Sequence, residues 1–169
     1  MLTGKDIVLR AWKESDLPKL TALRNDRSLQ AQLLTQPRPN SVPRVVRWLQ
    51  EKSEKPEGVF FIVAARDTDA PLGYIQIHQM DLQNRHCGLG ICLAAEAQGK
   101  GHGQEALLLV ERYVKETFGM RKIMLEVLLS NASAIRFYER YGFDRMGVMK
   151  AHFQIGNTYA DVLVMEKFS

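Results

Sequence analysis

The residues whose types and spacing best suit chemistry form a short loop from Gln98 to Gly103, with the sequence QGKGHG. Its three glycines stand at alternate positions, so the backbone can turn tightly and its N–H groups have no side chain to shield them. Helical spacing follows the loop and makes it a helix N-terminus, where free N–H groups and the helix dipole favour an anion. The pattern favours a phosphate or pyrophosphate, and a plain turn is the alternative.

Two better-known phosphate loops are excluded by their spacing. No Ser or Thr follows Lys100, as a P-loop requires, and the glycines do not fit the dinucleotide fingerprint that opens a βαβ unit. The loop taken alone therefore indicates an anion site of another kind.

Length, charge and cysteine content narrow the class of protein. A chain of 169 residues fits one domain, 1–169, and its net charge of +4 suits a polyanionic ligand but is too small to argue for nucleic acid. We find neither a signal-peptide pattern nor an apolar run that could span a bilayer, so no membrane contact is expected. Cys87 and Cys92 have an odd spacing in one predicted strand, which places them on opposite faces, and a reducing, cytoplasmic setting follows.

Helical periodicity predicts four helices that position the loop and its neighbours. Ser15 caps the first, which carries Leu17, Leu20 and Leu23, and residues 45–52 form the second. Prolines make the segment 24–43 irregular. The third helix runs from the glycine loop to Phe118, and the fourth is a short helix capped by Ser130 or Asn131 and ended by Gly142.

Strand-like alternation accounts for most of the remaining chain. The segments 72–78 and 87–93 are predicted to be an antiparallel pair, and the domain is a single mixed α/β unit. The predicted strands are 7–10, 59–65, 72–78, 87–93, 122–128, 143–149 and 158–166.

The order of these parts resembles a known family more closely than any one motif does. A strand leads into a Gln-x-x-Gly-x-Gly step that starts at Gln98, Asn131 stands seven residues before Tyr138, and Tyr-Gly-Phe at 141–143 closes the short helix. The chain resembles the GNAT superfamily of acetyl-CoA-dependent N-acetyltransferases, in particular its RimJ/RimL-like branch. The resemblance implies an α+β GNAT fold, with a mixed, mostly antiparallel central sheet of about six to seven strands flanked by helices.

The resemblance also implies that acetyl-CoA is the cosubstrate and that no metal takes part. The backbone of the glycine loop would cradle the pyrophosphate, and the preceding strand would offer backbone groups to the pantetheine arm. Lys100 and His102 either add positive charge or face water. Asn131 would bond the cofactor arm, with a helix N-cap as the alternative. The implied cofactor-binding residues are Ile91, Cys92, Leu93, Gln98, Gly99, Lys100, Gly101, His102, Gly103, Gln104, Asn131, Phe137 and Arg140.

Tyr138 matches the general acid of this family, which gives a proton to the departing coenzyme A thiolate. A phenol suits this role because its pKa is close to that of a thiol. The alternative is a core aromatic residue. Cys92 is expected to be a small core residue rather than a nucleophile, because the family transfers acetyl directly, and a backbone N–H near Cys92 would stabilise the thioester oxyanion.

The general base is left open by the sequence. Some relatives carry a glutamate at the position of Gly88, and no carboxylate replaces it within that strand. The candidates are His78, His86, Asp81, Asp161 and a chain of water molecules.

The resemblance implies that the acceptor is an amine of a small molecule or a peptide, and that the first two helices and the segment between them face it. This part of the chain is rich in arginine, which argues against a polyamine and suits an anionic acceptor such as a nucleotide-linked amino sugar. A protein N-terminus, as in RimJ/RimL enzymes, and a non-catalytic acetyl-CoA-binding module are alternatives. Relatives are often homodimers, a point these residues do not test. Against the single acid Asp26, that segment holds Arg24, Arg27, Arg38, Arg44 and Arg47, which can also be a solvated surface.

Overall fold

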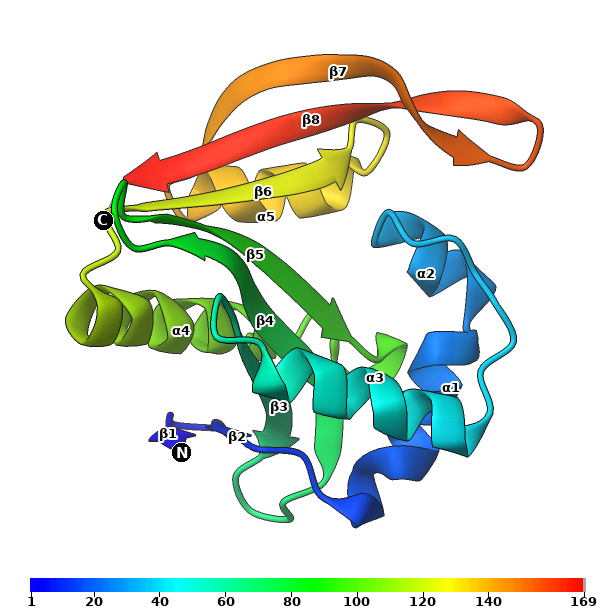
Figure 1. Cartoon of the computed structure of the whole chain (residues 1–169), viewed down its shortest axis with the longest axis vertical. Helices are drawn as coiled ribbons and strands as arrows, with labels where there is room; N and C mark the ends of the chain where they lie inside the picture. The colour runs from blue at the N-terminus through cyan, green and yellow to red at the C-terminus, as the bar shows by residue number, and fades with distance from the viewer. Residues whose placement is uncertain (169) are drawn as a thin grey trace.

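A computed structural model of the protein, which describes residues 1–168, contains one sheet of eight strands in the order β1-β2-β3-β4-β5-β6-β8-β7 (Figure 1). Every neighbouring pair is antiparallel except β5 and β6, which are parallel. The strands are β1 (Leu2–Thr3), β2 (Ile7–Arg10), β3 (Val59–Ala65), β4 (Pro71–Asp81), β5 (His86–Leu93), β6 (Lys122–Leu128), β7 (Asp144–Ile155) and β8 (Thr158–Phe168).

Helices cover both faces of this sheet. One hydrophobic cluster joins α4 and α5 to one face through residues such as Val110 and Ile135, and a second joins α1 and α3 to the other face through Leu20 and Leu49. The helices are η1 (Glu14–Asp16), α1 (Leu17–Asn25), α2 (Arg27–Gln32), α3 (Val42–Glu54), η2 (Ala95–Ala97), α4 (His102–Phe118) and α5 (Ala132–Arg140).

Strands β5 and β6 separate after a short paired segment. Residues 86–88 of β5 pair with residues 122–124 of β6, and no pairing joins the two strands beyond Gly88. Figure 1 shows the two strands diverging from that paired end. The divergence opens a wedge in the middle of the sheet. Helix α4 is the crossover that connects these two parallel strands.

Most predicted elements are confirmed. Cys87 belongs to the first hydrophobic cluster and Cys92 to the second, as their odd spacing predicts, and both thiols are free. Gly119 ends α4 in the left-handed region with φ of 66°. The Asn131 side chain caps α5 by accepting a hydrogen bond from Ala134 N.

Two predictions at the N-terminal side are wrong. Residues 24–43 are not wholly irregular, because the Asp26 side chain accepts from Leu29 N (2.9 Å) and starts α2. The prolines lie beyond that helix, and Pro43 occupies the first turn of α3, where no N–H is required. Ser15 does not cap α1, since it lies inside η1 and the cap position belongs to Asp16.

The sheet also extends further than predicted. Its eighth strand, β1, is a two-residue segment that pairs with β2, too short to show alternation. Strand β7 continues past Met149 to Ile155, because its pairing with β8 resumes after a register shift between Met149 and Phe153.

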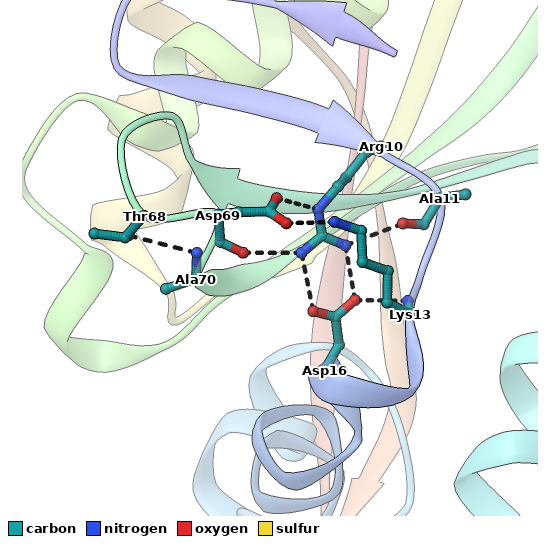
Figure 2. A network of polar contacts seen from close by, with 7 residues as sticks. All are labelled: Arg10, Ala11, Lys13, Asp16, Thr68, Asp69 and Ala70. Atoms are coloured by element: carbon teal, nitrogen blue, oxygen red, sulfur yellow. Dashed lines mark hydrogen bonds and ion pairs between the residues drawn. The ribbon is translucent and has the colours of Figure 1, made fainter.

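A buried ion pair ties the start of α1 to the sheet (Figure 2). Arg10 of β2 donates to both carboxylate oxygens of Asp16, at 2.8 and 2.9 Å, and Asp16 is completely buried. Arg10 also donates to the Asp69 backbone oxygen (2.9 Å), and the Lys13 N–H donates to Asp16 (2.8 Å). The network joins β2, the turn into α1 and the β3–β4 loop, and so fixes where α1 meets the sheet.

Residues 1–168 contain neither a candidate membrane-spanning helix nor a candidate metal-binding cluster. No helix there is both long and apolar enough to cross a membrane. No three His, Cys, Asp or Glu side chains of the same range are grouped to hold a metal ion.

Candidate active site

A cavity of about 940 Å³ occupies the wedge between β5 and β6, which is within the range of small-molecule and cofactor sites. Leu29 and Gln32 of α2 line its mouth. Every predicted site residue except Lys100 and His102 lines it: Ile91, Cys92, Leu93, Gln98, Gly99, Gly101, Gly103, Gln104, Asn131, Phe137, Tyr138 and Arg140.

The glycine loop has the backbone conformation that its composition predicts. Gly99 and Gly101 lie in the left-handed region, with φ of 72° and 85°, and Gly101 is the N-cap of α4. The first intrahelical bond there runs from Glu105 N to the Gly101 oxygen (3.0 Å). The N–H groups of residues 102–104 therefore precede the helical ladder, and such free groups at a helix N-terminus can donate to an anion. Gly103 and Gln104 line the cavity.

Two side chains of this loop hold it against the segment that precedes it. The Gln98 amide donates to the Leu93 oxygen (2.9 Å), and the His102 ring bonds the Ala97 oxygen (3.2 Å). Lys100 is exposed. A β-carbon at Gly103 would lie 3.4 Å from Leu93 and 3.7 Å from the Phe137 ring, which are ordinary van der Waals distances.

The backbone of β5 presents unpaired donors to the wedge. Ala94 N donates to the Leu72 oxygen of β4 (2.9 Å), and N–H groups alternate between the two sides of a strand. The N–H groups of Ile91 and Leu93 therefore point away from β4, into the space that β6 has left. These donors suit a carbonyl oxygen or the amides of an extended ligand arm.

Helix α5 brings an aromatic hydroxyl to the opposite wall. Tyr138 packs on Phe143 (ring centroids 5.5 Å apart) and on Phe137 (5.2 Å), and only 9% of the residue is exposed. No residue within 1–168 forms a hydrogen bond with its hydroxyl. Burial raises the pKa of Tyr138 to about 12, so the phenol is protonated near neutral pH and can donate a proton.

Cys92 lies on the face of β5 that packs against α1 and α3. It is 2% exposed, and burial raises the pKa of its thiol to about 12, so almost no thiolate forms at neutral pH. This environment is that of a core residue, not of a nucleophile.

The ring of His78 fills the space beside Gly88, the position where the resemblance implies a glutamate in some relatives. His78 of β4 pairs with Gly88 of β5, and a β-carbon at Gly88 would lie 2.2 Å from the His78 Cε1 atom. Both residues line the cavity. Burial, and next the charge of Lys52, lower the pKa of His78 below its usual 6.5, so the imidazole is neutral at pH 7 and can accept a proton.

The other base candidates are held in different ways. Asp81 accepts hydrogen bonds from Asn84 N (2.7 Å) and Gln83 N (3.0 Å), which stabilises a turn. Asp161 accepts from Ala151 N (2.8 Å) between β7 and β8 and does not line the cavity. His86 lines the cavity, and its Nε2 lies 3.7 Å from Asp81.

Four side chains that the structure places in a second, smaller pocket were not identified from the sequence: Arg24 was not distinguished from the other arginines, and Trp48, Lys52 and Gln76 were not named. Of the five arginines predicted to face the acceptor, Arg24 lines a side pocket, while Arg27, Arg38, Arg44 and Arg47 are exposed. Lys52, Trp48 and Gln76 line the same side pocket. The i, i+4 spacing of Trp48 and Lys52 on α3 was a usable signal, whereas Gln76 gave none.

Comparison with known proteins agrees with this geometry. The profile of the family described as "Acetyltransferase (GNAT) domain" matches residues 6–144. The SPbeta prophage-derived uncharacterized N-acetyltransferase YokL of Bacillus subtilis is 26% identical over 148 residues, which cover 88% of this chain and 81% of that protein. The spermidine N(1)-acetyltransferase of Vibrio cholerae is 24% identical over 159 residues, which cover 94% and 91%.

A solved structure shows the same fold. The crystal structure of spermidine N-acetyltransferase from Vibrio cholerae in complex with CoA and spermine superimposes with a TM-score of 0.88 at 24% identity. The match covers 96% of this chain and 95% of that one. With its splayed strands, glycine loop and matching family profile, the chain belongs to the GNAT family and is an acetyl-CoA-dependent N-acetyltransferase.

Proposed function

We propose that the protein acetylates a primary amine by direct transfer within a ternary complex, with Tyr138 as general acid and His78 as general base. The observation that carries this proposal is that both side chains line one cavity with the glycine loop. They belong to opposite faces of the sheet. Tyr138 packs in the cluster of α4 and α5, whereas His78 shares its strand face with Tyr74, which packs in the cluster of α1 and α3.

The donor side fits the cosubstrate that the family uses. Acetyl-CoA supplies an acetyl thioester when it is bound. The N–H groups of the glycine loop would hold its pyrophosphate, and those of Ile91 and Leu93 would bond the pantetheine arm and the thioester oxygen. Asn131 uses its Oδ1 as a helix cap, which leaves its amide N–H₂ for the cofactor arm. Phe137 and Arg140 line the same wall.

The two titratable groups divide the proton transfers between them. His78 takes the proton that the acceptor ammonium must lose before its nitrogen can attack. The C–N bond then forms, the C–S bond breaks, and Tyr138 gives its proton to the leaving thiolate. The low pKa of His78 and the high pKa of Tyr138 keep each group in the protonation state that its role requires.

The acceptor is proposed to be a small amine that carries negative charge, of which a nucleotide-linked amino sugar is one example. The basic side pocket beside the cavity supports this choice. A polyamine is the second candidate, because one relative, whose match covers 94% of this chain, is named a spermidine N(1)-acetyltransferase. A protein N-terminus is a third, from the resemblance to RimJ/RimL enzymes.

A thiol-release assay with acetyl-CoA tests the proposal. The panel contains nucleotide-linked amino sugars, amino acids, N-terminal peptides and polyamines, and binding of acetyl-CoA is measured in parallel. We expect anionic amines to accelerate thiol release most. If acetyl-CoA bound and no amine accelerated release, the proposed function would be wrong.

A further inference from the structure

A side pocket of about 270 Å³ opens next to the main cavity, on the sheet face covered by α1 and α3. Its volume equals that of ~9 water molecules at ~30 Å³ each, which is room for a small chemical group. The side pocket and the main cavity share Leu33, Gln76, Gly90 and Ile91. A ligand in the side pocket would therefore be continuous with one at the acetyl-transfer point.

Arg24 is held in this pocket without an acidic partner. Its guanidinium lies 4.6 Å from the centroid of the Trp48 ring, and one of its terminal nitrogens donates to Gln30 Oε1 (3.2 Å). Gln30 is itself buried and anchored, because its amide donates to the Leu23 oxygen (2.9 Å). The Nε of Arg24 is buried and has no hydrogen-bond partner within residues 1–168.

Lys52 supplies a second positive charge. Burial, and next the charge of Lys55, lower the pKa of its ammonium, and Arg24 adds to this effect. No carboxylate of residues 1–168 lines the pocket. The nearby acids are engaged elsewhere: Asp26 caps α2, and Glu51 pairs with Lys55 at 3.4 Å.

Gln76 stands where the two cavities meet. Its Oε1 is buried and has no hydrogen-bond donor within the part of the chain that the structure describes. An amine or hydroxyl at the junction can donate to this oxygen. The unpaired acceptor at the junction, Gln76 Oε1, therefore lies beside a pocket that holds the unpaired Arg24 Nε and the two cationic side chains, Arg24 and Lys52.

We propose that Arg24 and Lys52 form a subsite for an anionic group, a carboxylate or a phosphate, on the acceptor whose amine is acetylated. The inference rests on the proposed function and names its substrate class. Arg24 and Lys52 are half-buried cations that line one pocket without a carboxylate, and an anion from the ligand would offset their mutual repulsion. A polycation would add like charge to the same pocket.

Matched acceptor pairs test the subsite. We would compare kcat/KM for an amino acid and its amide, and for a phosphorylated amino sugar and its unphosphorylated form. The variants are Arg24→Met and Lys52→Met, with Arg47→Met as a control that removes one exposed charge from α3. Each pocket variant should lower the ratio of kcat/KM for the anionic member to kcat/KM for the neutral member ~10- to 100-fold, mainly through the KM of the anionic member. The ratio is the readout because the charge of Lys52 also lowers the pKa of His78, and a change in the base affects both members alike. The carboxylate and phosphate pairs distinguish the two anions.

Three results would overturn the subsite: no preference of the wild type for anionic members, equal losses for both members in Arg24→Met, or an effect of Arg47→Met as large as that of Arg24→Met. Binding of inorganic phosphate, measured with saturating coenzyme A to fill the glycine loop, needs no turnover. Phosphate binding that is lost in Arg24→Met supports the subsite, and no binding to the wild type overturns it. A protein that acetylates no amine overturns the proposed function, and phosphate binding then judges the subsite separately.

Discussion

The imidazole of His78 lies directly over Gly88 on the neighbouring strand, where a β-carbon would come within 2.2 Å of the ring. The two positions pair in register between β4 and β5. A side chain at position 88 and the ring of His78 therefore cannot occupy this space together. The glycine at position 88 therefore makes room for the His78 ring, and the proposed base comes from β4 instead of β5.

Replacement of His78 by Gln should lower kcat by ~10²- to 10⁴-fold without weakening acetyl-CoA binding, because it removes only the proton acceptor. In the wild type, kcat should reach half of its plateau only at a pH below 6.5, the ordinary histidine value, because the lowered pKa of His78 keeps the ring mostly neutral at pH 6.5. Steady-state kinetics across pH and equilibrium binding of acetyl-CoA measure both effects. His86→Gln, at the other histidine of the cavity, should change kcat little, and an equal loss there would contradict the assignment.

Replacement of Gly88 by Ala should lower kcat, because the new methyl group displaces the His78 ring. Gly147→Ala is the control, since its β-carbon would have no atom within 4 Å and the residue does not line the cavity. A double variant, His78→Ala with Gly88→Glu, places a carboxylate in the space that the ring occupied. It should recover part of the activity that His78→Ala loses, and no recovery would argue against a base at this place.

Replacement of Tyr138 by Phe should lower kcat by ~10²- to 10⁴-fold and leave the affinity for acetyl-CoA unchanged. Tyr141→Phe, one turn along and also in the cavity wall, is the control. Because the pKa of Tyr138 is about 12, wild-type kcat should not decline as the pH approaches 10.0, the usual phenol value. An unchanged kcat in the Tyr138 variant would remove it as the acid.

Replacement of Gly101 by Ala should weaken acetyl-CoA binding, because its φ of 85° is unfavourable for alanine by ~1–2 kcal/mol. If the loop relaxes to avoid this strain, the dissociation constant should rise ~5- to 30-fold. Saturating acetyl-CoA should restore kcat. Gly147→Ala, which has open space and no positive φ, is the control. Equal affinities for both variants would show that the loop conformation does not matter.

Replacement of Asp16 by Ala should lower the free energy of unfolding by ~3–5 kcal/mol, because Arg10 is 6% exposed and would lose its buried partner. Denaturant unfolding measures this loss. The double variant Arg10→Met with Asp16→Leu should be more stable than Asp16→Ala, since it leaves no uncompensated charge. If Asp16→Ala unfolded at the same denaturant concentration as the wild type, the network would not hold α1 to the sheet.

The sequence determined the donor side of the site. Glycines at alternate positions, an asparagine cap and a tyrosine seven residues after that cap are local signals, and each depends on backbone propensities that operate over a few residues. The resulting loop, α4 and α5 stand where those signals predicted. The odd spacing of Cys87 and Cys92 likewise fixed their faces, because side chains alternate along any strand.

Only the tertiary structure decided the acceptor side. His78 reaches the place of the missing glutamate because β4 and β5 pair in one particular register, which no local pattern encodes. Arg24 differs from the four exposed arginines around it because α2 brings Gln30 to its guanidinium and α3 brings Trp48. Long-range packing between helices and strands selects these partners, so the proposed base and the proposed anionic subsite could not be read from residue spacing alone.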